Sequence, residues 1–389
     1  MNVKKLRDDF PVFQKKVVYF DNACMTFKPR QVIAALNSYY TEFPACGERS
    51  EHQLGKIVTE KVEEARRIVA RFINAAPEEI IFTKNTTEAI NLVAHGLDLK
   101  KDDVVLTTDK EHNSNLLPWR RFKHEYVKSK ADNTFDLDAF EKKVKGAKLV
   151  AMGHTSNLDG VSIPAEEIID IAHKHGALVL LDGAQSVPHK GIDVRKLDVD
   201  FLAFSGHKMC GPTGTGVLYG KLSLLEKLKP FIVGGGTVKN SWYDKEEWEG
   251  VPHRFEAGLQ DYAGIIGLGE ACKYLQSVGM KNIERHELEL NKKMTDALAG
   301  EVNLIGPKDP ALRSGIFSFN IEGMDMHEIA GILDNSAGIA VRAGNHCVHS
   351  WFNAHNLKGS VRASVYFYNT LDEVERFVDE VKKILKFLK

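Results

Sequence analysis

Residues 178–208 read LVLLDGAQSVPHKGIDVRKLDVDFLAFSGHK, and this stretch decides the fold class. It contains two short apolar runs, Leu178–Leu181 and Phe201–Phe204. Apolar runs without polar alternation are typical of strands that are buried on both faces of a parallel sheet. The stretch therefore predicts one parallel strand–helix–strand unit.

The same pattern continues outward along the chain. Amphipathic stretches such as Pro164–Lys174 separate the apolar runs, and residues 56–75 carry apolar side chains at helical spacing. This alternation predicts an α/β fold with a large, doubly wound, mostly parallel sheet. The further strands that we expect are Glu79–Thr83, Val104–Thr107, Lys148–Met152 and Val217–Tyr219.

The pattern changes after Gly258. Helices and strands are mixed there at lower density, which indicates a smaller α+β domain at the C-terminal end. We expect the large domain to span residues 16–258 and the small domain to span 259–389 together with 1–15. The expected elements of the small domain are helices at 262–278, 281–299 and 371–389 and strands at Gly315–Ile321 and Ile339–Arg342.

Composition excludes several classes of protein. The 389 residues suffice for two or three domains. Lys and Arg total 52 against 53 Asp and Glu, and this balance disfavours a nucleic-acid partner. No apolar run approaches the ~20 residues that span a bilayer, and the first residues lack the apolar core of a secretory signal. Five cysteines, an odd number, do not suggest a disulfide framework, so we expect a reducing, cytoplasmic setting.

Polar side chains follow both strands of the opening stretch. Asp182 and Gln185 come after the first strand, and Ser205, His207 and Lys208 come after the second. The carboxyl ends of parallel strands meet at one edge of a sheet, so these groups should face one pocket. A lysine among apolar strands is costly to keep charged, so its pKa should fall and its amine should become nucleophilic. A lysine that forms a Schiff base needs this property.

These five groups together fit pyridoxal phosphate. Lys208 would bind the cofactor covalently, and Asp182 would pair with the protonated ring nitrogen. Ser205 and His207 would bind the phosphate, and Gln185 would bind the ring hydroxyl. The alternative is a surface SGHK turn with an unrelated aspartate, and the DGAQ segment one unit upstream disfavours it.

On these motifs the sequence resembles the class V aminotransferase family of fold type I pyridoxal-phosphate enzymes. Within that family it is similar to the SufS-like (group II) cysteine desulfurases, from VVYFDNA at Val17 to the final helix. The resemblance implies pyridoxal 5'-phosphate as cofactor, L-cysteine as substrate, a homodimer and a sulfur-accepting partner of the SufE or SufU type. It implies no metal site.

The resemblance also assigns residues at other strand ends. Thr86 and Thr87, in FTKNTTEAIN, lie at an expected helix start, where they suit a phosphate or serve as an ordinary N-cap. His112, in TDKEHNSNLLPW, would stack on the cofactor ring and transfer protons. Asn157, in GHTSNLDG, would lie near the ring hydroxyl and the substrate.

A cysteine loop follows in the segment IAVRAGNHCVHSWF, where His346 and His349 flank Cys347. The group II pattern makes Cys347 the nucleophile that takes the substrate sulfur as a persulfide, leaving L-alanine. Thiolate is the reactive form, so neighbouring cations should matter. Arg362, in VRASVYFYNT, would grip the substrate carboxylate with its planar fork, and Arg342 is a second cation. The alternative for Cys347 is an ordinary buried cysteine.

The sequence departs from the family pattern at RFEAGLQ, where relatives usually have RFEAGTP. Leu259 cannot donate the hydrogen bond by which the usual threonine reaches the partner subunit's phosphate. Either Gln260 replaces that contact or the contact is missing.

Three further cysteines, Cys24, Cys46 and Cys210, lie near expected active-site segments. They could crowd the pocket with Cys347 as a sulfur relay or as ligands of an iron–sulfur cluster. The alternative is that they are scattered small apolar residues. Cys272, in an expected helix, is assigned to the core.

The leading hypothesis is a cysteine desulfurase that supplies sulfur for iron–sulfur clusters or thiolated cofactors. A selenocysteine lyase could use the same residues. An aminotransferase or epimerase of this fold is disfavoured by the pairing of Cys347 with Arg362. A non-enzymatic scaffold or sulfur acceptor would have no need of Lys208, Asp182 and His112.

Overall fold

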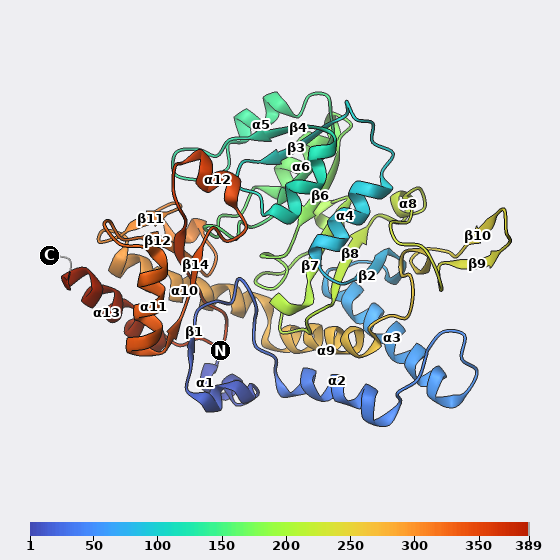
Figure 1. Cartoon of the computed structure of the whole chain (residues 1–389), viewed down its shortest axis with the longest axis horizontal. Coiled ribbons are helices and arrows are strands. Elements are labelled where there is room, and N and C mark those ends of the chain that lie inside the picture. The colour runs from blue at the N-terminus through green and yellow to red at the C-terminus, as the bar shows by residue number, and fades with distance from the viewer. Residues whose placement is uncertain (388–389) are drawn as a thin grey trace.

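The computed structural model describes residues 1–387 and shows two main sheets (Figure 1), together with two two-stranded sheets, β1-β13 and β10-β9. The larger sheet has seven strands in the order β2-β8-β7-β6-β5-β3-β4. Neighbouring strands are parallel except where β8 pairs with β2 and β7. The smaller sheet has four antiparallel strands in the order β11-β12-β15-β14. The α/β fold class expected from the sequence is thus confirmed.

The strands within residues 1–387 are β1 (Val18–Tyr19), β2 (Ile80–Thr83), β3 (Val104–Thr108), β4 (Lys123–Val127), β5 (Ala147–Gly153), β6 (Leu178–Asp182), β7 (Phe201–Ser205), β8 (Gly216–Gly220), β9 (Val238–Ser241), β10 (Glu246–Trp248), β11 (Asn303–Ile305), β12 (Ile316–Asn320), β13 (Ile339–Ala340), β14 (Arg342–Gly344) and β15 (Ser360–Ser364). The α-helices are α1 (Val3–Arg7), α2 (Arg30–Glu42), α3 (Gln53–Phe72), α4 (Thr86–Gly96), α5 (Leu137–Lys143), α6 (Ala165–Lys174), α7 (Val194–Leu197), α8 (Leu222–Leu225), α9 (Tyr262–Val278), α10 (Met280–Leu298), α11 (Met326–Ala337), α12 (His349–Ala354) and α13 (Leu371–Phe387).

The larger sheet is covered on both faces, which explains its continuous apolar runs. In β5, Val150 and Met152 pack into the core that α3, α6 and α9 share. Leu149 and Ala151 point the other way, into the core beneath α4. Successive strand residues alternate between two apolar layers, so no polar position is needed.

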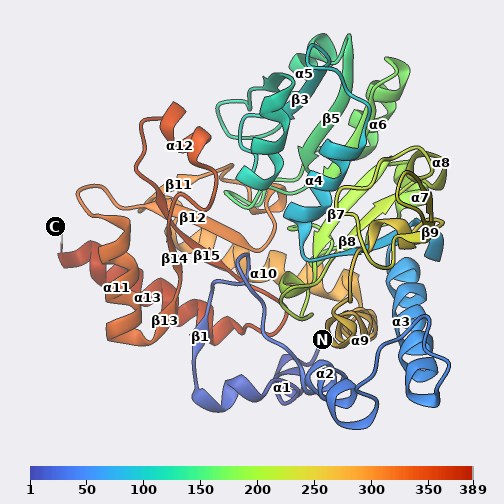
Figure 2. The same ribbon diagram turned by 45° about the vertical axis from the view of Figure 1, so that its right-hand side comes forward.

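The smaller sheet has its own core, which includes side chains of α10, α11 and α13. Figure 2 shows this sheet beside the larger one, with α11 and α13 on its outer side. Helix α9 instead packs on α2 and α3, and Phe10 of the N-terminal segment joins the same core as α9. The expected division of the chain at residue 258 stays a prediction.

Several element boundaries differ from expectation. The helix expected at 56–75 begins earlier, at Gln53, and ends at Phe72. The strand expected at Ile339–Arg342 is two short strands, because β13 pairs with β1 whereas β14 pairs with β15. The last two residues of the helix expected at 371–389 lie outside the described residues. No helix within residues 1–387 is both long and apolar enough to cross a membrane.

A buried ion pair links α3 to the segment before α9. Arg66 Nη1 and Nη2 donate to Glu256 Oε1 and Oε2 at 2.8 and 2.9 Å, and the side chains are 2% and 3% exposed. The backbone N–H of Phe82 in β2 also donates to Glu256 Oε1, at 2.7 Å. The pair therefore joins a covering helix to the edge of the large sheet.

We expect the substitution Glu256→Ala to lower the free energy of unfolding by about 3 kcal/mol, because it leaves the buried Arg66 with only Glu63, at 3.1 Å and partly exposed, as its carboxylate partner. Urea denaturation followed by circular dichroism measures this. Asp296→Ala breaks the exposed pair between Lys292 and Asp296 and should change the free energy by no more than about 0.5 kcal/mol. Equal losses in the two variants would contradict the prediction.

Candidate active site

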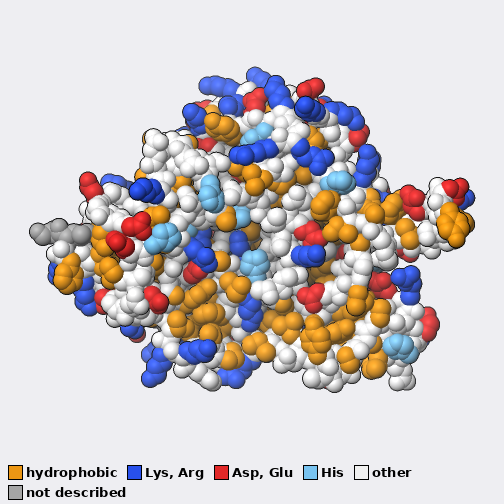
Figure 3. Space-filling view, in the orientation of Figure 1, with side chains coloured by type: hydrophobic (Ala, Val, Ile, Leu, Met, Phe, Trp, Pro, Cys, Tyr) orange, Lys and Arg blue, Asp and Glu red, His pale blue; other side chains and the backbone are white. Residues whose placement is uncertain are grey.

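A cavity of about 280 Å³ lies where the carboxyl edge of the large sheet meets β14 and β15. Figure 3 shows basic and histidine side chains around the hollow in the middle of this face. All twelve residues that the sequence assigns to the site line the cavity, although they come from both sheets. They are Thr86, Thr87, His112, Asn157, Asp182, Gln185, Ser205, His207, Lys208, Arg342, Cys347 and Arg362.

Lys208 ends a short 3₁₀ turn that follows β7 directly, so the strand aims its amine at the cavity. Burial of the amine lowers the pKa of Lys208, while Asp182 is the main group that opposes this shift. A lower pKa raises the fraction of neutral amine near neutral pH, and neutral amine is the nucleophilic form. The structure therefore gives this lysine the property that the sequence predicts.

Asp182 and Gln185, in the cavity wall, each have a side-chain oxygen that can accept a further hydrogen bond. Asp182 accepts the backbone N–H of Ala184 at 2.9 Å, and burial raises the pKa of its carboxyl group. Gln185 donates to the carbonyl of Ala23 at 2.7 Å, but its buried Oε1 has no hydrogen-bond partner within residues 1–387. A protonated ring nitrogen would offset the cost of the Asp182 charge, and a ring hydroxyl would satisfy Gln185. The residues present therefore fit pyridoxal phosphate.

The start of α4 forms another wall of the cavity. The backbone N–H of Thr86 donates to Ser205 Oγ at 2.8 Å, and the two hydroxyl groups are 2.6 Å apart. Thr87 follows in the first turn of this helix. Helix N-termini and hydroxyl groups favour phosphate. Burial lowers the pKa of His207 to about 4, so near neutral pH its ring is an uncharged hydrogen-bonding group.

His112 follows β3 and caps a short turn. Its Nδ1 accepts the backbone N–H of Ser114 at 3.1 Å, which places the ring proton on Nε2. Burial, reinforced by the charges of Lys208 and Arg362, lowers the pKa of His112 to about 3. The ring is therefore neutral near neutral pH and can lie against a flat cofactor without adding charge.

Cys347 occupies a strained loop between β14 and α12. His346 and Cys347 have φ values of 48° and 59°, the left-handed region that non-glycine residues seldom adopt. Hydrogen bonds from beyond the loop hold it. Asn113 N–H donates to the Cys347 carbonyl at 2.8 Å, and Asn157 Nδ2 donates to the His346 carbonyl at 2.7 Å. Such strain persists only where surrounding structure imposes it, and it gathers at functional sites.

Arg362 projects from β15 toward the same space. Its Nη1 donates to the Asn157 carbonyl at 2.9 Å, whereas its buried Nε has no partner within residues 1–387. A buried guanidinium N–H without a partner calls for an acceptor. A carboxylate would supply one and also suit the planar fork of the side chain.

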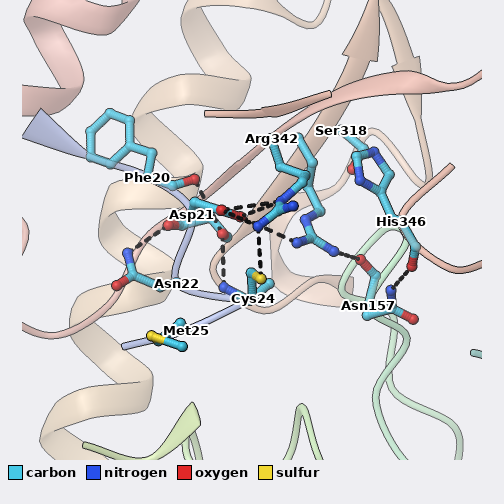
Figure 4. A network of polar contacts seen from close by, with 12 residues as sticks. Phe20, Asp21, Asn22, Cys24, Met25, Asn157, Ser318, Arg342 and His346 are labelled. Carbon is cyan, nitrogen blue, oxygen red and sulfur yellow. Dashed lines mark hydrogen bonds and ion pairs between the residues drawn. The ribbon is translucent and has the colours of Figure 1, made fainter. Parts of the chain in front are cut away.

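The sequence analysis missed Asp21, which orients both arginines. Asp21 Oδ2 accepts from Arg342 Nη2 at 2.8 Å, and Asp21 Oδ1 lies 3.5 Å from Arg362 Nη2 (Figure 4). Arg342 Nη2 also donates to Cys24 Sγ at 2.8 Å. The available signal was a carboxylate directly after the short apolar run of VVYFDNA.

The sequence analysis also missed Glu111, which lines the cavity beside His112. Its carboxylate accepts from Thr108 Oγ1 at 2.6 Å, Asn115 Nδ2 at 2.7 Å and the Gly153 N–H at 2.9 Å. Burial raises the pKa of Glu111 to about 7, although these donors oppose the shift. Glu111 thus ties the turn that carries His112 to the end of β5.

Of the two interpretations of the three extra cysteines, crowding of the pocket is wrong for two of them. Cys210 is buried in the main core, and Cys46 is exposed near Tyr262, with 4.0 Å between Sγ and the hydroxyl oxygen. Cys24 alone of the three lines the cavity. Cys272 is buried in the core, as expected. Within residues 1–387 no three His, Cys, Asp or Glu side chains are placed to share a metal ion.

The segment that departs from the family pattern lies apart from the cavity of this chain. Leu259 is 73% exposed, and Gln260 Nε2 donates to the Ala257 carbonyl at 3.0 Å. Gln260 lines a different cleft, between α3 and the β9–β10 hairpin. Leu259 therefore offers an exposed apolar side chain at the position of the usual threonine.

Several known proteins that share one name resemble this chain over nearly its whole length. A probable cysteine desulfurase of Pyrococcus abyssi is 42% identical and covers 99% of this chain, which spans 98% of that protein. The apo cysteine desulfurase of Thermococcus onnurineus NA1 superposes with a TM-score of 0.95 at 41% identity, covering 98% of both chains. The Escherichia coli cysteine desulfurase CsdA, in an S-sulfonic acid form, has a TM-score of 0.91 at 33% identity. The match covers 100% of this chain and 99% of that one.

A family model described as aminotransferase class-V matches residues 18–377. That range contains every residue of the cavity. The relatives above have the name cysteine desulfurase in common. This chain belongs to the class-V aminotransferase family and, within it, to the cysteine desulfurases.

Proposed function

We propose that this chain converts L-cysteine to L-alanine and stores the released sulfur as a persulfide on Cys347. The observation that supports this most is the meeting of a lysine, a carboxylate-binding arginine and an exposed thiol at one cavity. Lys208 and Arg362 come from different sheets, so the fold is needed to bring them together. A cysteine desulfurase or a selenocysteine lyase needs all three groups, whereas an aminotransferase, an epimerase or a non-enzymatic scaffold does not.

The cofactor is pyridoxal phosphate, which when bound withdraws electrons from the α-carbon of an amino acid. Asp182, Gln185 and the start of α4 would hold it in place. Arg362 binds the substrate carboxylate through its free Nε and orients the amino acid. Lys208 then takes the α-proton, because burial lowers the pKa of its amine. The thiolate of Cys347 attacks the sulfur of the oriented substrate, and a sulfur–sulfur bond forms. The carbon–sulfur bond breaks, its electron pair passes to the β-carbon, which takes up a proton, and alanine leaves.

The sulfur leaves the enzyme from an exposed position. Cys347 lies at the surface end of the cavity, so a thiol of an acceptor protein can reach its persulfide. An acceptor of the SufE or SufU type is part of this proposal, and so is delivery of sulfur to iron–sulfur or thiolated cofactors. Persulfide chemistry needs reduced thiols, and this supports a cytoplasmic setting as part of the proposal.

A homodimer is also part of the proposal. Apolar side chains are exposed on α2 and α3 and at the family's cross-subunit segment, and Figure 3 shows apolar surface over α2 and α9. The β9–β10 hairpin projects from the same end of the molecule (Figure 1). Exposed apolar patches mark association surfaces. The exposed side chains include Ile33, Tyr40, Leu54, Ile57 and Leu259.

The decisive experiment is a product balance. The purified holoenzyme is incubated with L-cysteine and reductant, and alanine and sulfide are measured together. The proposal requires equal amounts of the two. Formation of a keto acid in place of alanine would refute it in favour of an aminotransferase. A parallel reaction with L-selenocysteine measures which of the two amino acids the enzyme prefers.

Substitution of Arg362 by lysine should raise the KM for L-cysteine by about tenfold to a hundredfold, since one hydrogen bond to a charged group contributes about 1.5–3 kcal/mol. Lysine keeps the charge but loses the fork. Steady-state kinetics measure KM and kcat separately, and Arg376→Lys, far from the cavity on α13, is the control. An unchanged KM would contradict the role of Arg362.

A further inference from the structure

Two thiols of this chain share the active-site cavity, and the proposed function uses only one of them. Cys24 lies in the turn after β1, and Cys347 lies in the loop after β14. Arg342 Nη2 donates to Cys24 Sγ at 2.8 Å (Figure 4). The other three cysteines do not line this cavity.

The surroundings of Cys24 are built to hold its sulfur in one place. Asp21 fixes the guanidinium of Arg342, since Arg342 Nε and Nη2 donate to Asp21 Oδ2 at 3.1 and 2.8 Å. The same Nη2 then reaches Cys24, so the cation cannot turn away from the sulfur without breaking the pair with Asp21. Reactive cysteines are partly exposed and lie beside Lys, Arg or His cations. Cys24 meets both conditions, since it is half-buried and contacts Arg342.

Cys24 and Cys347 line the same cavity as Lys208. A persulfide extends the reach of Cys347 by one S–S bond, about 2 Å. Because Asn113 and Asn157 hold the loop backbone, the approach to Cys24 depends on this added length and on rotation of the Cys347 side chain.

We propose that Cys24 is a second sulfur carrier, which takes the outer sulfur of the Cys347 persulfide. The Cys24 thiolate attacks that sulfur, a new S–S bond forms at Cys24, and the bond to Cys347 breaks. Cys347 leaves as a thiolate, and the proton of the persulfide stays on the transferred sulfur. One S–S bond replaces another, so no oxidant or reductant is consumed. The freed Cys347 can then accept a second sulfur before any acceptor arrives.

This inference rests on the proposed function, because the persulfide of Cys347 is its starting point. It changes the number of sulfur atoms that one subunit can hold before an acceptor arrives. Without an acceptor or reductant, each subunit should form alanine until both thiols carry sulfur. With Cys24 removed, alanine formation should stop when Cys347 is filled.

The test measures the burst of alanine formed by the holoenzyme with L-cysteine in the absence of acceptor and reductant, followed by peptide mass spectrometry. The parent should give a burst about twice that of Cys24→Ser, the pattern of a covalent intermediate that accumulates. Serine keeps an acceptor for Arg342, and the cofactor absorption checks folding. The Cys24 peptide should gain one sulfur in the parent and none in Cys347→Ala. Cys46→Ser, outside the cavity, should leave the burst unchanged.

Four results would overturn the relay. They are equal bursts in the parent and Cys24→Ser with sulfur on Cys347 alone, sulfur on Cys24 in the Cys347→Ala variant, equal labelling of Cys46 and Cys24, and a disulfide between Cys24 and Cys347 with release of sulfide. The first leaves the proposed function intact. Absence of sulfur from both Cys347 and Cys24 in the parent would instead refute the proposed function, and the relay with it.

Discussion

Replacement of Lys208 by alanine is expected to lower the turnover of L-cysteine by about a thousandfold or more, because it removes both the covalent attachment of the cofactor and the base. Lys110 also lines the cavity, but its amine is paired with Asp159 at 2.8 Å, so it is not placed to take over both tasks. The visible absorption of covalently bound cofactor should disappear along with activity. Spectra and sulfide release from the same preparation measure the two effects together.

A matched control comes from the same strand–helix–strand unit. Burial also lowers the pKa of Lys190, but this lysine lies at a separate cleft with Glu166 and Asp193. Lys190→Ala should therefore keep the absorption band and the turnover. If the band persists in Lys208→Ala, or vanishes equally in both variants, the assignment of the lysine is wrong.

Replacement of Cys347 by alanine is expected to reduce sulfide release by at least about a hundredfold, since the step that accepts the substrate sulfur loses its nucleophile. Cofactor binding should survive, because none of the groups that fit the cofactor depends on Cys347. Addition of L-cysteine should still change the cofactor spectrum. This combination separates loss of the sulfur step from loss of substrate binding.

The control for this variant is Cys46→Ala, which removes another exposed thiol away from the cavity. It should release sulfide at the parent rate. Sulfide release from Cys347→Ala at the parent rate would eliminate the persulfide route. The same rate loss in Cys46→Ala would point to general thiol chemistry instead.

The sequence predicted which polar groups meet at one cavity where those groups directly follow a buried strand. Asp182 and Lys208 stand directly after β6 and β7, and parallel pairing brings their strand ends to one edge whatever the rest of the chain does. The same reasoning missed β4, whose sequence KHEYV is polar and partly exposed at the sheet edge. It also missed β15, whose SVRAS sequence contains the buried Arg362 and so does not look apolar.

Contacts between segments that are distant in the chain could not be predicted from the sequence. Asp21 reaches Arg342 and Arg362 because β1 pairs with β13, and no local pattern encodes that pairing. Closeness to an active-site residue along the chain was also a poor guide to whether a side chain lines the cavity. Cys210 follows Lys208 by two residues, yet its side chain points into the core, where burial raises the pKa of its thiol to about 12. Residues that are neighbours in sequence lie close together, but their side chains can point in different directions.

The strained loop of Cys347 has a consequence for sulfur delivery. The chain places this loop on the smaller sheet, but Asn113 and Asn157 tether it to segments that follow strands of the larger one. The loop backbone is thus held in place, and the Cys347 sulfur moves by rotation of its side chain. Under the proposed function, an acceptor protein would therefore have to bring its own mobile thiol to the enzyme. The flexibility that sulfur transfer requires should therefore be looked for in the segment of the acceptor protein that carries its thiol.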